Sequence, residues 1–172
     1  PRQAWAAFGS AAAASFLLAG YEFIRSPSNT LFQAAYGTKN LPAVQAVMPI
    51  AALGLVYLYG WILSKAGPRR ALLITTLGSG GAITLCWAAG RTGLAPATVA
   101  LYLFREVYVV LIIEQYWSLI NSTLDENAAR KFNGWITGIA TLGAIGGGIL
   151  VYRLSETLGT AAMLLFAAAS VV

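Results

Sequence analysis

The sequence predicts an all-α, polytopic membrane protein. Of its 172 residues, 58% are hydrophobic and only 10% are charged, whereas an ordinary soluble domain carries about 25% charged residues. The mean hydropathy is +0.70, and the apolar residues come in runs of about 18 or more, the length that a helix needs to cross a bilayer. This composition excludes a water-soluble enzyme, a disordered chain and a collagen-like chain. The net charge of +5 indicates basic cytoplasmic loops, so we expect no nucleic-acid partner.

Residues 1–172 are treated as a single transmembrane domain. Breakers between the apolar runs predict six helices, at about 5–36, 41–64, 71–89, 97–122, 133–152 and 160–172. Pro27 lies inside the first run, and Pro42 opens the second, in a first turn where a missing N–H costs little. The runs are too long for barrel strands, which need only about 9 to 11 residues. Because the last run stops without a polar flank, we expect the chain to be a fragment of a longer protein.

The distribution of basic residues predicts how the helices are oriented. The expected loops are short, so they leave no room for a soluble domain. If the N-terminus is cytoplasmic, the cytoplasmic side carries six basic residues, namely Arg2, Lys65, Arg69, Arg70, Arg130 and Lys131. The opposite side then carries three, namely Lys39, Arg91 and Arg153. Since basic residues are enriched in cytoplasmic loops, this asymmetry favours a cytoplasmic N-terminus.

Residue types that carry common enzyme chemistry are scarce. The chain has no histidine, and its single cysteine, Cys86, lies inside an apolar run. Without histidine there is neither a Ser-His-Asp triad nor a histidine metal cluster, and one thiol gives no disulfide. We therefore expect no enzymatic activity, no metal and no cofactor.

Five ionisable residues lie in or beside the apolar runs, namely Glu22, Arg25, Arg105, Glu106 and Glu114. A charge at the bilayer centre costs about 2.5 to 3.5 kcal/mol on insertion scales, so such residues face a cavity or an opposite charge. Glu22 and Arg25 are three residues apart and share one helix face, which continues to Asn29. Nine residues separate Arg105 from Glu114, which places them on opposite sides of an undistorted helix.

These observations give the candidate substrate path, which consists of Glu22, Arg25, Asn29, Arg105, Glu106 and Glu114. A second interpretation stays open. The same charges would form ion pairs between neighbouring helices and simply lock the bundle together.

The segment from Gly60 to Leu72 connects the second and third runs on the expected cytoplasmic side. It resembles the signature between helices two and three of the major facilitator superfamily, which it matches at Gly60, Lys65, Gly67 and Arg69, with Arg70 adjoining. Glycine permits a close helix approach at residue 60 and a tight turn at residue 67. The resemblance implies a loop that gates the inward-open state, with Gly60, Ser64, Lys65, Gly67, Arg69 and Arg70. Ser64 replaces the family's acidic residue. The alternative is that the segment is basic only because short cytoplasmic loops in general are basic.

Five short motifs lie at residues 21–25 (YEFIR), 39–42 (KNLP), 59–61 (YGW), 116–119 (YWSL) and 128–134 (AARKFNG). They are similar to motifs of the TLC-type ATP/ADP translocases, the nucleotide exchangers of plastids and intracellular bacteria, which have free-living bacterial relatives. The resemblance covers roughly residues 20 to 150. Ser28 and Asn29 stand where members often carry another basic and another acidic residue, which makes a nucleotide a less secure substrate.

This resemblance implies a twelve-helix secondary transporter of which the chain is the N-terminal half, built from two inverted three-helix repeats. Such a half moves by alternating access around a site near the bilayer midplane. The implied partners are the bilayer, a small anionic solute and either the missing C-terminal half or a second protomer. The implied location is the bacterial inner membrane.

The fifth run contains glycines at four-residue spacing, namely Gly134, Gly138, Gly143 and Gly147. This spacing favours close helix packing through small residues. Such faces also suit a rival function, in which a transporter relative that moves no solute serves as a scaffold or assembly factor among other membrane subunits.

Overall fold

The computed structural model describes the backbone of residues 2–171, and their side chains except at 2, 68, 69, 72, 115, 118–123 and 171. The described residues are almost entirely helical and contain no strand. The α-helices are α1 (Arg2–Tyr36), α2 (Leu41–Arg91), α3 (Ala95–Thr123), α4 (Glu126–Leu158) and α5 (Met163–Val171). Short 3-10 turns at Thr38–Asn40 and Thr160–Ala162 precede α2 and α5.

The second and third expected helices are joined in one element, α2. It bends at Gly67, whose φ of 75° and ψ of 166° lie outside the helical region. A positive φ is readily adopted by glycine because it has no Cβ, so the expected loop at 65–70 shrinks to a break at one residue. We call residues 41–67 the first arm of α2 and residues 73–91 its second arm.

α4 is longer than the expected range at both ends. α4 begins at Glu126, seven residues before the apolar run, and continues to Leu158. Glu126 and Arg130 form an ion pair of 2.8 Å one turn apart, which supports a helical first turn in this polar segment. The ranges derived from hydropathy were therefore too short, because a helix continues past the apolar run that crosses the membrane.

Five helical segments of the described chain are long and apolar enough to span a membrane: Gln3–Tyr36, Thr38–Gly67, Leu73–Arg91, Ala95–Glu114 and Glu126–Leu158. A shorter apolar segment, Thr160–Ser170, follows. The chain is accordingly a multi-pass membrane protein.

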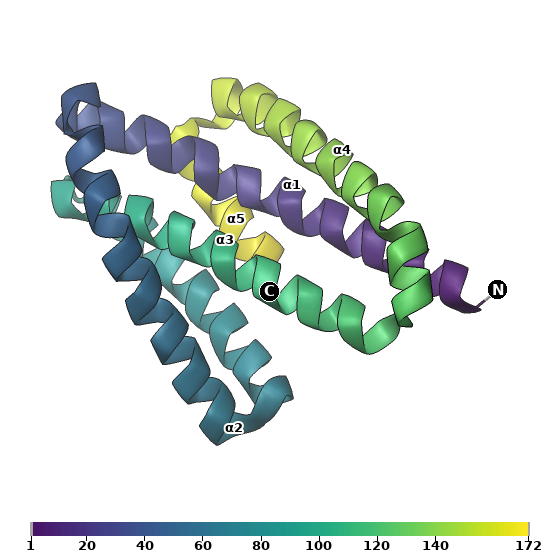
Figure 1. Cartoon of the computed structure of the whole chain (residues 1–172). Helices are drawn as coiled ribbons and strands as arrows, with labels where there is room; N and C mark the ends of the chain where they lie inside the picture. The colour runs from purple at the N-terminus through teal and green to yellow at the C-terminus, as the bar shows by residue number, and fades with distance from the viewer. Residues whose placement is uncertain (1, 172) are drawn as a thin grey trace.

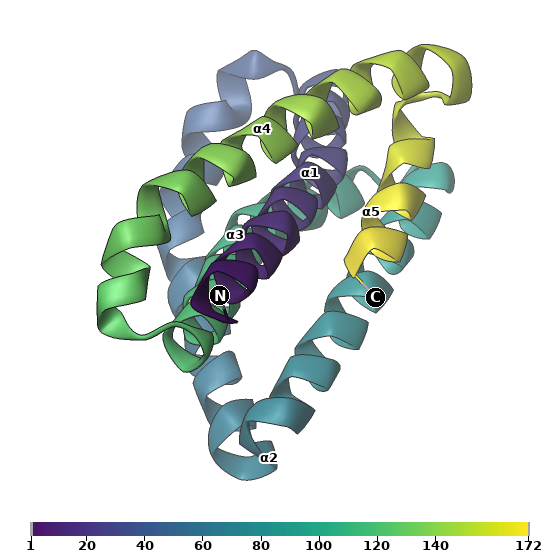
Figure 2. The same ribbon diagram turned by 90° about the vertical axis from the view of Figure 1, so that its right-hand side faces the viewer.

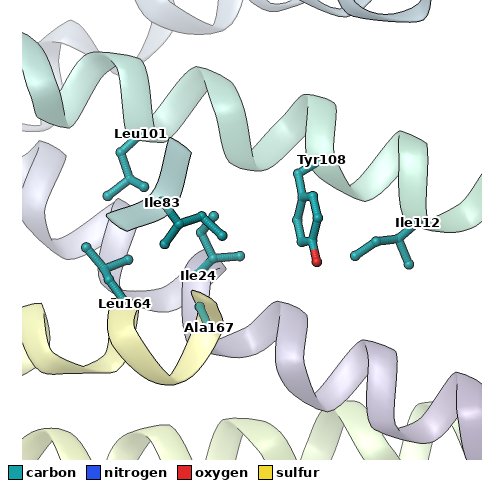
Figure 3. Packing of buried hydrophobic residues seen from close by; sticks show 7 residues of the cluster. All are labelled: Ile24, Ile83, Leu101, Tyr108, Ile112, Leu164 and Ala167. Carbon is teal, nitrogen blue, oxygen red and sulfur yellow. The ribbon is translucent and has the colours of Figure 1, made fainter. Parts of the chain in front are cut away.

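α1 packs against α3, α4 and α5, whereas α2 packs against α3 and α5. Figure 1 shows α4 running alongside α1 in the same direction, with α3 on the other side of α1 and the two arms of α2 forming a hairpin. In Figure 2 the short α5 lies beside the second arm of α2. A buried cluster joins four helices (Figure 3) and consists of Ile24, Ile83, Leu101, Tyr108, Ile112, Leu164 and Ala167.

Small residues bring α1 and α4 into close contact. A Cβ added at Gly147 would lie 2.6 Å from the Cα of Ala19, and one added at Gly143 would collide with the backbone of Ser15. No such contact occurs at Gly134 or Gly138, where an added Cβ would meet nothing within 4 Å. Of the two glycine pairs with four-residue spacing, only the second therefore packs against another helix in this chain. Close packing at the first pair is not formed within the described chain and stays a prediction for contacts with other subunits.

Candidate functional site

Four charged side chains gather where α1 passes α3. Glu22 and Arg25 lie on α1, and Arg105 and Glu106 lie on α3, at the middle of the Ala95–Glu114 span. Tyr21 interacts electrostatically with all four, which places them in one neighbourhood. We call Glu22, Arg25, Arg105 and Glu106 the charged quartet.

Each arginine of the quartet pairs with a carboxylate on its own helix. Arg25 Nε lies 3.1 Å from Glu22 Oε2, and Arg105 Nη2 lies 2.6 Å from Glu106 Oε1. The quartet therefore holds two positive and two negative charges. Its ion pairs do not cross between helices.

One polar contact of the quartet joins the two helices. Arg105 Nη1 donates a hydrogen bond of 3.0 Å to the backbone oxygen of Arg25. The hydroxyl of Ser28 donates to the same oxygen, also at 3.0 Å. This carbonyl lies two residues before Pro27, inside α1. Two donors thus fix the backbone at the point where α3 crosses α1.

The guanidinium of Arg105 has partners on several sides, but not all of its nitrogens have a hydrogen-bond partner. Its carbon lies 4.3 Å from the centre of the Tyr102 ring, a distance that permits a cation–π interaction. The side chain is only 7% exposed, and its buried Nε has no hydrogen-bond partner. A buried donor left without an acceptor costs about 1 to 3 kcal/mol. Among the four residues, Arg105 alone has a buried polar atom without a hydrogen-bond partner.

Burial differs sharply within each ion pair. The Arg25 side chain is 54% exposed while Glu22 is 12% exposed, and Glu106 is 33% exposed beside the buried Arg105. Each pair therefore presents one accessible charge, positive on α1 and negative on α3.

Polar side chains extend the exposed side of α1 beyond Arg25. Ser26, Thr30 and Gln33 are exposed, and Asn29 is half-buried. A polar stripe on a membrane-spanning helix is costly against lipid and is found where the helix faces water, a cavity or protein. We call Arg25, Ser26, Asn29, Thr30 and Gln33 the polar stripe of α1.

Glu114 is separate from the quartet. It is exposed on α3, about two turns beyond Glu106, and no ion pair among the described side chains includes it. The expectation from helical spacing was that Arg105 and Glu114 point in different directions, and their burial differs accordingly.

The expected gate residues lie around the bend of α2. The Ser64 hydroxyl donates to the Trp61 backbone oxygen at 2.8 Å, and the Lys65 ammonium lies 5.4 Å from the centre of the Trp61 ring. Arg70 is exposed, whereas the side chain of Arg69 lies outside the described part of the chain. An added Cβ at Gly60 would meet nothing within 4 Å, so the close approach expected there is absent from this structure.

Sequence reasoning missed two aromatic partners of the quartet, Tyr102 and Tyr21. Tyr102 precedes Arg105 by three residues, a spacing that places both on one helix face. Tyr21 is adjacent to Glu22 in the sequence. Both signals were present, but an aromatic residue inside an apolar run has no distinguishing feature before its neighbours in space are known.

An apolar cavity of about 250 Å³ lies apart from the quartet. It is lined by both arms of α2 and by α3, for example by Leu55, Ile62, Ile74, Phe104 and Leu111. Its described lining includes the hydroxyl groups of Tyr59, Thr75 and Ser79 but no charged residue, so it lacks a fixed charge to hold an anion.

No family model, no curated protein and no solved structure matches the chain. The similarity to transporter motifs therefore rests on the short segments described above.

Proposed function

We propose that this chain forms one half of a secondary transporter that moves a small organic anion by alternating access. The charged quartet and the polar stripe of α1 supply one wall of the substrate path. A C-terminal half of the same protein, or a second protomer, supplies the other wall. Nucleotide exchange is the specific form of this activity that the motif resemblance implies.

The pairing within the quartet carries this proposal. Ion pairs that lock a bundle connect one helix to another, but Glu22 with Arg25 and Arg105 with Glu106 are each formed within one helix. Their opposite charges stabilise each other at membrane depth while half of Arg25 and a third of Glu106 stay exposed. Such an arrangement suits a polar path better than a structural lock.

The polar stripe supports the same function. It faces away from the buried contacts of α1, because four of its five residues are exposed and the fifth is half-buried. Lipid is a poor neighbour for Arg25, Ser26 and Asn29 at this depth. A water-filled path between two halves accommodates them.

The pattern of helix contacts is compatible with two inverted three-helix repeats. In such an architecture the first three spans (α1 and the two arms of α2) correspond in order to the last three (α3, α4 and α5). The contact between α1 and α4 then has a counterpart, which is a contact between α3 and the first arm of α2. That second contact is present, since Val44 and Tyr102 belong to one buried cluster. The contact of the second arm with α5, between Ile83 and Leu164, maps onto itself. We take this symmetry as support for the proposed transporter architecture.

The rival proposal is a scaffold or assembly factor that moves no solute. Gly134 and Gly138 favour it, since both are exposed and have open space beside them. Another membrane subunit could pack closely there through small residues. The two functions differ in what covers the polar stripe, which is water in a transporter and protein in a scaffold.

Uptake into proteoliposomes tests the proposal. The full-length gene product is reconstituted, and entry of labelled ATP, ADP and smaller organic anions is measured against empty vesicles. We expect uptake by the wild type and at least a tenfold loss in Arg25→Ala and Arg105→Ala. Arg130→Ala is the matched control, because Arg130 also pairs with a glutamate on its own helix but is 79% exposed outside the quartet.

A full-length protein that moves none of these solutes, and that co-purifies in fixed ratio with other membrane subunits, would favour the scaffold instead. Equal loss of uptake in Arg130→Ala and Arg105→Ala would remove the quartet from the path.

A further inference from the structure

We propose that the Nε and Nη2 edge of Arg105 is a receptor for two oxygens of one oxyanion, a carboxylate or a phosphate group, and that Glu106 occupies half of this edge until the anion displaces it. This inference rests on the proposed function, because it names the chemistry by which the same path recognises its solute.

The geometry of the guanidinium carries the inference. Nη1 is committed to the backbone oxygen of Arg25, which leaves the opposite edge, with Nε and Nη2, for other partners. An arginine binds carboxylate or phosphate most strongly when two parallel N–H groups of one edge reach two oxygens. Glu106 reaches Nη2 through one oxygen, and Nε remains without a partner. The edge is therefore half-filled.

Glu106 is placed to act as the exchangeable partner. Arg105 is buried and anchored by Nη1 and by the Tyr102 ring, so its position is fixed by the α1–α3 contact. Glu106 is one third exposed and follows Arg105 directly in the chain. In the proposed exchange, rotation of the Glu106 side chain releases Nη2 and opens access to Nε, which is buried in this structure.

An incoming oxyanion gains one contact more than Glu106 makes. It takes over Nη2 and also satisfies Nε, which has no acceptor in the present state. Glu106 therefore competes with the solute, and the binding strength of the path depends on this competition.

Anion binding to the full-length protein in detergent tests the inference, by calorimetric titration with inorganic phosphate and, separately, with acetate. We expect Glu106→Gln to bind at least one of these anions about tenfold more tightly than the wild type, because the internal competitor is neutral. Tighter binding of phosphate alone identifies a phosphate receptor, and tighter binding of acetate alone identifies a carboxylate receptor.

Glu126→Gln is the matched control. It makes the same chemical change and frees Arg130 from a carboxylate at 2.8 Å, but that pair is exposed on both sides. Its anion affinity should equal that of the wild type.

Arg105→Lys tests whether the anion is held by two N–H groups of the guanidinium edge or only by the positive charge. Lysine keeps the positive charge but has no pair of parallel N–H groups, so the tight binding gained in Glu106→Gln should disappear in the Arg105→Lys/Glu106→Gln double variant. The melting temperature of each variant is measured to show that it is folded. If the double variant does not fold, the comparison of Glu106→Gln with Glu126→Gln still decides the matter.

The inference is overturned if Glu106→Gln binds phosphate and acetate no more tightly than Glu126→Gln. This result would leave the proposed transport function intact, since uptake is measured separately in proteoliposomes. Conversely, a protein that transports nothing but binds anions more tightly after Glu106→Gln would refute transport and retain the receptor.

Discussion

The two halves of α1 differ in how they meet their neighbours. Before Tyr21, the helix packs on α4 through small residues, with Ser15 and Ala19 opposite Gly143 and Gly147. After Tyr21, it carries Glu22, Arg25 and the polar stripe, and its contact with α3 includes a hydrogen bond from a buried arginine. One helix thus combines a close backbone contact with a polar, partly open surface.

This difference indicates that the two halves of α1 have different roles. Close backbone contact leaves little freedom between α1 and α4, because neither helix can approach or separate without losing its packing. The charged half is held at a few points and keeps accessible charge. We infer that the α1–α4 contact fixes the position of α1, so that the quartet is presented at a constant depth.

The largest expected effect on stability comes from filling the close contact. Gly147→Ala should destabilise the protein by about 3 kcal/mol, because the new methyl group meets the backbone of Ala19, which cannot move aside. Gly148→Ala is the matched control at the next position, where an added Cβ meets nothing within 4 Å, and it should be neutral or stabilising by up to about 1 kcal/mol. Unfolding titrations in mixed detergent micelles measure both. Equal effects would show that α1 and α4 are not in backbone contact.

A smaller loss of stability is expected when the Arg105–Glu106 ion pair, at the point where α3 crosses α1, is broken. Arg105→Leu leaves Glu106 without its cation and the Arg25 carbonyl without one of its donors, which should cost about 1 to 2 kcal/mol. The Arg105→Leu/Glu106→Leu double variant should recover most of this loss, since an apolar pair often replaces an ion pair without penalty. The same unfolding titration tests this, and a double variant less stable than Arg105→Leu would contradict the pairing.

The smallest effect on stability, with a large effect on transport, is expected at Arg25. Its side chain is more than half exposed, but it pairs with the buried Glu22, so Arg25→Gln is combined with Glu22→Gln, which leaves no uncompensated carboxylate. This double variant should change stability by less than about 1 kcal/mol. Uptake by the full-length protein should nevertheless fall at least tenfold, because the accessible positive charge is lost. A variant with normal uptake would place Arg25 outside the path.

Part of this arrangement was predictable from the sequence. Run length and composition predicted the helical class and the membrane spans, since hydropathy reflects the cost of polar groups in lipid directly. The insertion cost of charge selected Glu22, Arg25, Arg105 and Glu106 as candidates. Whether these residues contribute to transport stays a prediction.

Other features depended on spatial relations that one sequence does not contain. Gly134 with Gly138 and Gly143 with Gly147 have the same spacing, yet only the second pair faces α1. Arg105 was expected either in a path or in ion pairs between helices, but it pairs with its neighbour Glu106 and donates to a backbone carbonyl of α1. Spacing along one helix does not say which side faces which neighbour.

The central claim, that the polar stripe of α1 faces water, is tested most directly by cysteine labelling. Ser26→Cys and Asn29→Cys are introduced one at a time into the full-length protein with its native cysteines, including Cys86, replaced by serine. Leu53→Cys and Leu85→Cys serve as controls at exposed apolar positions, one on each arm of α2. A membrane-impermeant thiol reagent is then applied from each side of the membrane in turn. We predict rapid labelling at residues 26 and 29 from at least one side and none at residues 53 and 85, whereas a stripe as unreactive as these apolar controls would contradict the claim.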